Sequence, residues 1–201
     1  MNQSQIEKFG KELNKLIASH HCLYQLPCMA EFAEELISKA LSSASIPNEW
    51  HPTRSHAIST DIVGENGTTF SVKSGAFSKK KGELVISGSR LGKHGNLTDM
   101  VNAVLATSAD YYICLARDKQ DWEPYPLENE GKIYFLFVFP KSALDYRAGP
   151  WVKVVGRSGT SFTYEMEGAG IKASIRPSMS HQLWTSVNIS RTGEPLQVTI
   201  K

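Results

Sequence analysis

The chain has 201 residues, 41% of them hydrophobic and 21% charged, so it can bury a core of ordinary size without disulfides or a structural metal. Its 22 basic residues against 20 acidic ones leave a net charge of only +2, which excludes a protein that binds nucleic acid through bulk charge alone. The odd count of 3 cysteines does not fit a secreted disulfide scaffold, so we expect a cytoplasmic protein. The longest apolar run, Ile133–Pro140, is far below the roughly 20 residues of a membrane helix, and no membrane partner is expected.

Two helices are predicted at the beginning of the chain. In residues 6–17, apolar side chains recur at steps of three and four, which is the spacing of one helical face. The same spacing runs from Met29 to Leu41, with Pro27 close to the first turn. Residues 46–54 contain two prolines, so we expect a connection without regular structure there.

The apolar period then changes to two. Residues 57–63 and 68–74 flank Glu65-Asn66-Gly67 and predict a hairpin, and residues 83–87 predict a third strand. A helix is predicted over residues 97–109, and the apolar runs 111–116 and 133–139 are typical of strands buried on both faces. The order ααβββαββ predicts an α/β fold of the α+β kind, with a mixed sheet that carries helices on its faces.

The end of the chain has a different character. From about residue 146, apolar residues alternate with Ser, Thr, Lys and Arg, and Gly or Pro interrupts the runs, which predicts short β-hairpins. We therefore expect a core domain over residues 1–145 and a β-rich extension over residues 146–201 that packs on the core.

A carboxylate and a lysine are predicted to meet in the middle of the sheet. Asp61 lies late in the first strand of the hairpin, and Lys73 lies in the second. An aspartate can bind a hard divalent cation such as Mg²⁺ through oxygen, and a nearby lysine can hold a scissile phosphate. Phosphodiester hydrolysis needs both charge neutralisation at phosphorus and a nucleophile at neutral pH.

The length of the hairpin loop decides whether these side chains share a face, because side chains alternate along a strand. A two-residue turn at Asn66-Gly67 pairs residue 61 with residue 72 and leaves Ser71 and Lys73 on the opposite face. A three-residue loop with a left-handed Gly67 pairs residue 61 with residue 71 and brings Asp61, Ser71 and Lys73 to one face. The order x-Asn-Gly favours the three-residue loop, because glycine accepts a positive φ without a Cβ penalty.

With these residues the chain resembles the PD-(D/E)XK nuclease superfamily, whose αβββαβ core carries an acid on its second strand and (D/E)-x-K on its third. The resemblance covers residues 29–116, through Thr60-Asp61 and Ser71-Val72-Lys73. Thr60 stands where the family has proline and Ser71 where it has the second acid, as in type II restriction endonucleases with S-x-K. The resemblance implies a restriction-endonuclease-like core, a Mg²⁺ cofactor bound by Asp61, and catalysis by Asp61, Ser71 and Lys73.

The resemblance also implies that a glutamate completes the metal site, often from the helix that precedes the sheet. Glu31, Glu34 and Glu35 are candidates on that helix. At 100° per residue, Glu34 lies nearest the edge of the apolar stripe, so it is the predicted catalytic residue and second metal ligand. Glu83, in the third strand, is the other possible donor.

Basic residues gather in the region that follows Lys73. Between Ser71 and Gly95, six lysines and arginines stand against one acid, whereas residues 109–145 carry four bases and seven acids. Such a stretch can bring cations against phosphates and base edges, although a solvated lysine loop is the alternative for its first part. The residues expected to bind DNA here are Lys79, Lys80, Lys81, Arg90, Lys93 and His94.

The extension is the candidate for sequence recognition. Residues 147–201 carry seven bases and three acids, and polar side chains in turn-rich positions can donate to and accept from base edges in the major groove. The residues expected to bind DNA there are Arg157, Lys172, Arg176 and His181. An edge hairpin that merely covers the core is the alternative.

The sequence thus predicts a Mg²⁺-dependent type II restriction endonuclease. A short palindromic site in double-stranded DNA would be cut by a homodimer, because a two-fold protein matches a two-fold site. A partner methyltransferase is implied by the resemblance only. The alternatives are a sequence-independent repair or structure-selective nuclease with the same core, and a non-catalytic DNA-binding module that lost its metal chemistry with the second acid.

Overall fold

The computed structural model describes residues 1–23, 30–50, 60–106, 109–118, 133–156, 161–177 and 180–199. The described helices are α1 (Gln3–Leu23), α2 (Ala30–Ser43), α3 (Leu97–Leu105) and α4 (Ile189–Thr192), with short 3₁₀ turns η1 (Lys79–Lys81) and η3 (Lys141–Ala143). The strands are β1 (Asn48–Trp50), β2 (Ile62–Gly64), β3 (Thr69–Ser78), β4 (Glu83–Arg90), β5 (Tyr111–Asp118), β6 (Ile133–Pro140), β7 (Val152–Val155), β8 (Phe162–Gly168), β9 (Ile171–Arg176), β10 (Gln182–Asn188) and β11 (Leu196–Thr199).

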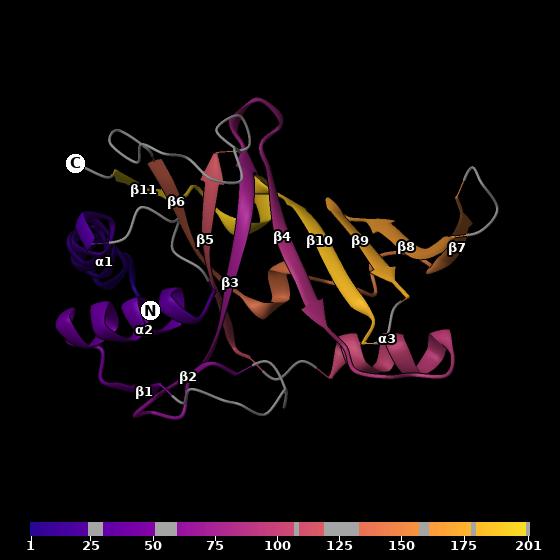
Figure 1. Ribbon diagram of the computed structural model, residues 1–201, viewed down its shortest axis with the longest axis horizontal. Coiled ribbons are helices and arrows are strands. Elements are labelled where there is room, and N and C mark those ends of the chain that lie inside the picture. The colour runs from indigo at the N-terminus through magenta and orange to yellow at the C-terminus, as the bar shows by residue number, and fades with distance from the viewer. Residues whose placement is uncertain are drawn as a thin grey trace.

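All these strands form one 11-stranded sheet (Figure 1). Its main path runs β11-β6-β5-β3-β4-β10-β9-β8-β7, while β2 pairs with the beginning of β3 and β1 pairs with β2. The pairing of β3 with β5 is parallel, and the other pairings are antiparallel. The protein is therefore a mixed α/β fold with a large, mostly antiparallel sheet.

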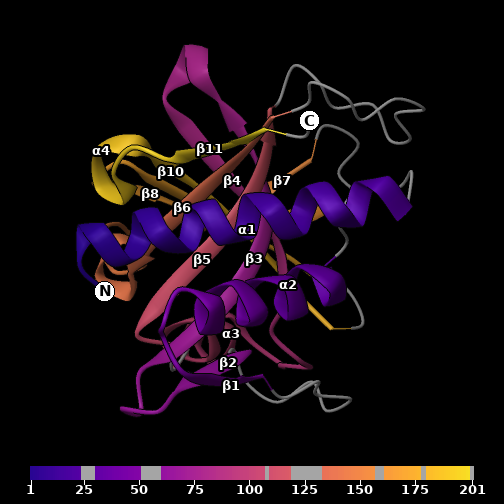
Figure 2. The ribbon, with the colours of Figure 1, turned by 90° about the vertical axis from the view of Figure 1, so that its left-hand side faces the viewer.

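The helical periodicity at the beginning of the chain is confirmed by α1 and α2. In α1, Phe9, Leu13 and Ile17 are fully buried, and Asn2 caps the first turn by accepting a hydrogen bond from the backbone N–H of Gln5 at 2.9 Å. Figure 2 shows α1 and α2 lying across the sheet in front of β3 and β5. These helices form because an apolar face is buried against the strands, which contributes more than helix propensity does.

The sheet separates two apolar cores. On one face, Phe70 and Val72 of β3 pack with α1 and α2. On the other face, Phe77 of β3 packs with α3, with β5 and β6, and with the strands of the extension. Because side chains alternate along a strand, Ser71 and Lys73 point to the face that carries α3, away from α1 and α2.

Several boundaries differ from the sequence-based expectation. The segment expected to be an irregular connection contains β1, because residues 48–50 pair with β2. Helix α3 ends at Leu105 rather than at residue 109, and β4 continues to Arg90 rather than ending at residue 87. Between α2 and β5 the order is therefore αββββαβ, with one strand more than the expected αβββαβ. Residues 57–59 of the predicted first hairpin strand lie outside the described residues.

The extension continues the sheet at both of its edges. Strands β7–β10 form an antiparallel meander that joins β4 through β10, and β11 pairs with β6 at the opposite edge. Residues 146–201 thus share one continuous sheet with residues 1–145. Among the helices described, none is both long and apolar enough to cross a membrane.

Candidate active site

The loop between β2 and β3 sets the register of the hairpin. Ile62 pairs with Phe70 and Val63 with Thr69, so residue 61 stands opposite residue 71, and the backbone N–H of Asp61 donates to the carbonyl of Phe70 at 2.9 Å. The loop is the three-residue Glu65-Asn66-Gly67, and Gly67 has a φ of 79°. The prediction of a three-residue loop is confirmed, and the two-residue alternative is excluded.

This register brings Asp61, Ser71 and Lys73 together. One oxygen of the Asp61 carboxylate, Oδ2, accepts a hydrogen bond from the Val72 backbone N–H at 2.6 Å and one from the Ser71 hydroxyl at 3.2 Å. Lys73 Nζ lies 3.7 Å from the same oxygen. The side chains of Lys73 and Asp61 are 20% and 18% exposed, and Ser71 is fully buried. The carboxylate is therefore held in one orientation at a half-buried position.

The other carboxylate oxygen, Oδ1, takes part in none of these contacts. A carboxylate with one free oxygen can ligate Mg²⁺, which binds proteins through one or two carboxylates and completes its shell with water and substrate phosphate. Asp61 thus fits a magnesium ligand. Within the described part of the chain, however, no group of three or more His, Cys, Asp or Glu side chains gathers around a metal position, so a second protein ligand is not identified.

Cys114 lies beside this site but is not a nucleophile. It pairs with Lys73 across the parallel β3–β5 ladder. Burial raises the pKa of its thiol to about 12, against the smaller lowering effect of the Lys73 charge. The thiol therefore stays protonated at neutral pH.

The predicted second ligand, Glu34, is held on the other side of the sheet. Its Oε2 accepts a hydrogen bond from Trp50 Nε1 at 3.4 Å, and Trp50 packs against the core under α1 and α2. Trp50 pairs with Ile62, so its side chain points to the face opposite to that of Asp61. Glu34 stays a prediction, which this geometry does not favour.

Two of the other candidate glutamates also lie elsewhere. Glu35 forms an ion pair with Lys39 on the surface of α2, and the side chain of Glu31 is outside the described residues. Glu83 pairs with Ser78, five residues along β3 from Lys73, which is roughly 17 Å away. Glu83 is therefore excluded as a ligand of a metal bound by Asp61.

The predicted DNA-binding lysines Lys79, Lys80 and Lys81 form η1, the turn between β3 and β4. Lys79 Nζ lies 4.9 Å from the centre of the Phe135 ring. This turn follows Ser78, which is five residues and roughly 17 Å along β3 from Lys73, so a ligand bound at Lys73 would have to span half of the strand to reach it.

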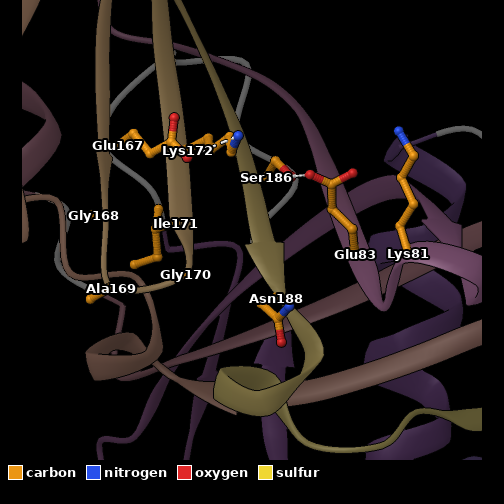
Figure 3. A pocket seen from close by; sticks show the side chains of 10 residues that line it. All are labelled: Lys81, Glu83, Glu167, Gly168, Ala169, Gly170, Ile171, Lys172, Ser186 and Asn188. Atoms are coloured by element: carbon orange, nitrogen blue, oxygen red, sulfur yellow. Dashed lines mark hydrogen bonds and ion pairs between the residues drawn. The ribbon is translucent and has the colours of Figure 1, made fainter.

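Lys172 is bound in an ion pair near the same end of the sheet. Lys172 Nζ lies 2.9 Å from Glu167 Oε1 beside a hollow of about 490 Å³. Figure 3 shows this pair and, next to it, Ser186, whose hydroxyl donates to Glu83. The Glu167 hydrogen bond and charge raise the pKa of Lys172. The bases and acids of this hollow offset one another, so it offers no net cation to a phosphate.

Three other predicted DNA-binding residues lie at the opposite end of the sheet, where β4 ends and β10 begins. The backbone N–H of Leu91 donates to the His181 carbonyl at 2.9 Å, His181 Nε2 lies 3.0 Å from the His94 carbonyl, and the two imidazoles stack at 6.3 Å. Lys93, in the same connection, is exposed. These contacts give both histidines structural roles in the turn.

Arg90 and Arg176 lie beside this turn and are both exposed. Each pairs with Gln182, so the three residues form one line across β4, β10 and β9. Arg157 lies outside the described residues. The structure thus separates the described members of the predicted DNA-binding set into one group at η1 and one where β4 ends. Asp61 stands beside the beginning of β3, but Asp61 and Lys73 point to the face of the sheet that carries α3, whereas Arg90 and Arg176 point to the other face.

Trp184 is a residue at this end that the sequence analysis did not identify. The Arg176 guanidinium lies 4.8 Å from the centre of its ring, and a Cβ at residue 88 would lie 2.9 Å from its Nε1. The sequence did carry one signal. Leu183, Thr185 and Val187 alternate with Gln182, Trp184 and Ser186, so Trp184 is on the face of its strand that carries the more polar side chains. The contact with Gly88 arises from pairing between distant strands and has no local signal.

Comparison with models of known protein families, with curated proteins and with solved structures finds no match to this chain. Its function is therefore inferred from the chemistry of its own residues.

Proposed function

We propose that this protein is a Mg²⁺-dependent nuclease that hydrolyses phosphodiester bonds of double-stranded DNA at a specific short sequence, as a type II restriction endonuclease does. The observation that carries the proposal is the arrangement of Asp61, Ser71 and Lys73: an oriented carboxylate whose Oδ1 has no partner among the described residues, and an ammonium group 3.7 Å from its Oδ2. A half-buried pair of this kind can bind a cation and a phosphate side by side.

Each residue of the site has a distinct part in this proposal. Ser71 and the Val72 backbone N–H orient the Asp61 carboxylate, so that Oδ1 is available to hold the metal. Bound Mg²⁺ supplies charge neutralisation at the phosphate and lowers the pKa of water. Lys73 donates to a non-bridging oxygen of the scissile phosphate, where negative charge increases as the reaction proceeds. The low exposure of both side chains strengthens these interactions, because fewer waters screen the charges.

Site specificity and the homodimer belong to the same proposal. The exposed arginines Arg90 and Arg176 support DNA recognition where β4 ends, on the face of the sheet opposite to Asp61 and Lys73, and a two-fold dimer would present one such site to each strand of a palindrome. Size-exclusion chromatography with light scattering measures the dimer directly. A monomer that still cuts both strands at one sequence would remove the dimer from the proposal.

A non-catalytic DNA-binding protein is the second candidate. It is favoured by the single carboxylate at the site, because Ser71 stands where a second metal ligand would be expected and no group of three potential ligands occurs among the described residues. In this case Asp61 would serve only to orient Lys73 toward a phosphate.

The test is digestion of a plasmid of known sequence with the purified protein, in Mg²⁺ and in EDTA, with the cut ends mapped by sequencing. Discrete fragments in Mg²⁺ with common ends support the proposal. Nicks or a smear indicate a sequence-independent nuclease. A shift of the plasmid in a native gel without any cutting identifies the binding protein and contradicts the nuclease.

A further inference from the structure

Arg90, Gln182 and Arg176 form a polar row on the face of the sheet opposite to α3. Gln182 pairs with Arg90 on one side and with Arg176 on the other, so their side chains point to the same face. The neighbouring Leu183 and Ile175 are buried in the core on the other face. The row is therefore presented to solvent, with the two arginine Cα atoms roughly 10 Å apart across two strand spacings.

Trp184 supports one end of this row. Its side chain lies on the same face as Gln182, two residues along β10, and its ring is covered by the Arg176 guanidinium at 4.8 Å. The ring passes close over Gly88, where a Cβ would lie 2.9 Å from Trp184 Nε1. Stacking restricts the orientation of the planar guanidinium and leaves its N–H groups available in a fixed plane.

The arrangement of Trp184 is not the one that stability alone would favour. Its Nε1 is buried and has no hydrogen-bond partner in the described structure, and an unpaired buried donor costs about 1–3 kcal/mol. An unpaired buried donor in a native structure calls for an explanation, and support of a ligand-binding arginine is the one that this contact offers.

The charges of the row are also uncompensated. Within the described residues, Arg90 and Arg176 have no carboxylate partner, whereas Lys172, further along the same face, is paired with Glu167. The acids Glu83 and Glu167 lie around the hollow at the far end of β10 and β9 (Figure 3). The face is thus positive and unpaired at one end and balanced at the other, which favours an anionic ligand at the row.

The side-chain types in the row match the edges of DNA bases. Arginine binds guanine O6 and N7 with two hydrogen bonds, glutamine binds adenine N6 and N7 in the same way, and a two-stranded β-ribbon fits the major groove. Arg176 is the last residue of β9 and Gln182 the first of β10, so both lie at one end of these two inner strands, beside their connection. The row lies near the beginning of β3, as Asp61 does, but on the opposite face of the sheet, because Asp61 and Lys73 point to the face that carries α3.

We propose that the Arg90–Gln182–Arg176 row, supported by Trp184, reads base edges in the major groove of duplex DNA and sets the sequence preference of the protein. This inference rests on the proposed function, because it takes the DNA substrate from it. The row is a binding surface, and it takes no part in the bond-breaking step.

The test selects bound duplexes from a pool of 30-base-pair DNAs with a random central segment, in EDTA so that none is cut. The wild-type protein is expected to enrich one motif. Gln182→Ala and Arg176→Lys are expected to lose the preference at one or two base pairs and to bind the wild-type motif roughly 5- to 150-fold more weakly. Arg176→Lys keeps the charge but not the planar fork, so it separates base reading from simple attraction. Lys39→Gln, which removes an ion-paired lysine from α2, is the control and should keep the motif and the affinity.

Each outcome has a defined meaning once circular dichroism shows that the variants melt as the wild type does. If both row variants select the wild-type motif, the row does not read bases, even if the salt dependence of their binding changes. The nuclease proposal is unaffected by this outcome when plasmid is still cut in Mg²⁺. A relaxed motif together with failure to cut in Mg²⁺ supports the row and contradicts the nuclease. No enrichment of any duplex by the wild-type protein overturns both.

Discussion

Two lysine–carboxylate pairs of this protein look alike in sequence and differ in their surroundings. Lys172 and Glu167 are separated by 2.9 Å, and their side chains are 63% and 69% exposed, whereas Lys73 and Asp61 are separated by 3.7 Å and are 20% and 18% exposed. The shorter pair is the weaker one, because water screens two exposed charges and their side-chain entropy is lost when they pair.

The two pairs also differ in what else holds them. Glu167 and Lys172 stand on neighbouring strands, and neither is buried by its surroundings. Asp61 is fixed by the Ser71 hydroxyl and the Val72 backbone N–H, and Lys73 lies over the buried Cys114. The distance between charges is therefore a poor guide to function. Orientation and burial distinguish a site from a surface ion pair.

The largest expected effect is the loss of plasmid cleavage when the charge of Asp61 or Lys73 is removed. In the proposed nuclease, Asp61→Asn would remove the charge that holds the cation, and Lys73→Gln would remove the charge that faces the phosphate. Each should reduce plasmid cleavage in Mg²⁺ at least about 100-fold. Asparagine at residue 61 still offers an oxygen to the Val72 N–H, so the fold should persist. Initial rates of cleavage measure the effect, with Lys39→Gln as the control, and a variant of Asp61 that cuts at the wild-type rate would place the active site elsewhere.

The next effect concerns the close packing beside Lys73. A Cβ at residue 75 would lie 2.5 Å from the Val85 carbonyl and 3.1 Å from Cys114 Sγ. Gly75→Ala should therefore destabilise the fold by about 1–3 kcal/mol, because a backbone carbonyl in a ladder cannot move aside cheaply. Urea unfolding monitored by circular dichroism measures the change. An unaltered midpoint would mean that β3 and β4 are further apart than described.

A smaller effect tests the loop that aligns Asp61 with Ser71. Gly67 has a φ of 79° and open space around it, so Gly67→Ala meets no clash and costs only the strain of a left-handed alanine, about 1 kcal/mol. Gly67→Asn should recover part of this loss, since asparagine tolerates that conformation better. The two unfolding free energies are compared in the same urea series, and equal stability of alanine and glycine at this position would contradict the three-residue loop.

The smallest effect is expected for the exposed pair. Lys172→Gln should leave the free energy of unfolding almost unchanged, because isolated surface pairs contribute little. Raising the salt concentration should reduce even this difference. Thermal melts at low and high salt measure it, and a loss comparable to that of Gly75→Ala would show that exposure is not what distinguishes the two pairs.

The sequence alone determined the features that depend on neighbouring residues. The spacing of Phe9, Leu13 and Ile17 was sufficient for α1, since the period of a helix is local. The order Glu65-Asn66-Gly67 was sufficient for the loop, and the loop length then put Asp61 opposite Ser71 by alternation. The alignment of Asp61 with Ser71 and Lys73 in the candidate site could therefore be predicted from the sequence.

Only the tertiary structure decided which distant segments meet. The apolar stripe of α2 pointed to Glu34 as a metal ligand. In the structure, Glu34 accepts a hydrogen bond from Trp50, and Trp50 lies on the face of the sheet opposite to Asp61. Strand β10 inserted between β4 and β9 aligns Arg90 with Gln182 and Arg176, and the same pairing brings Trp184 over Gly88. The contacts between β4 and β10 join residues more than ninety positions apart. They are selected by how whole faces of the sheet are buried together, for which no short stretch of sequence carries a signal.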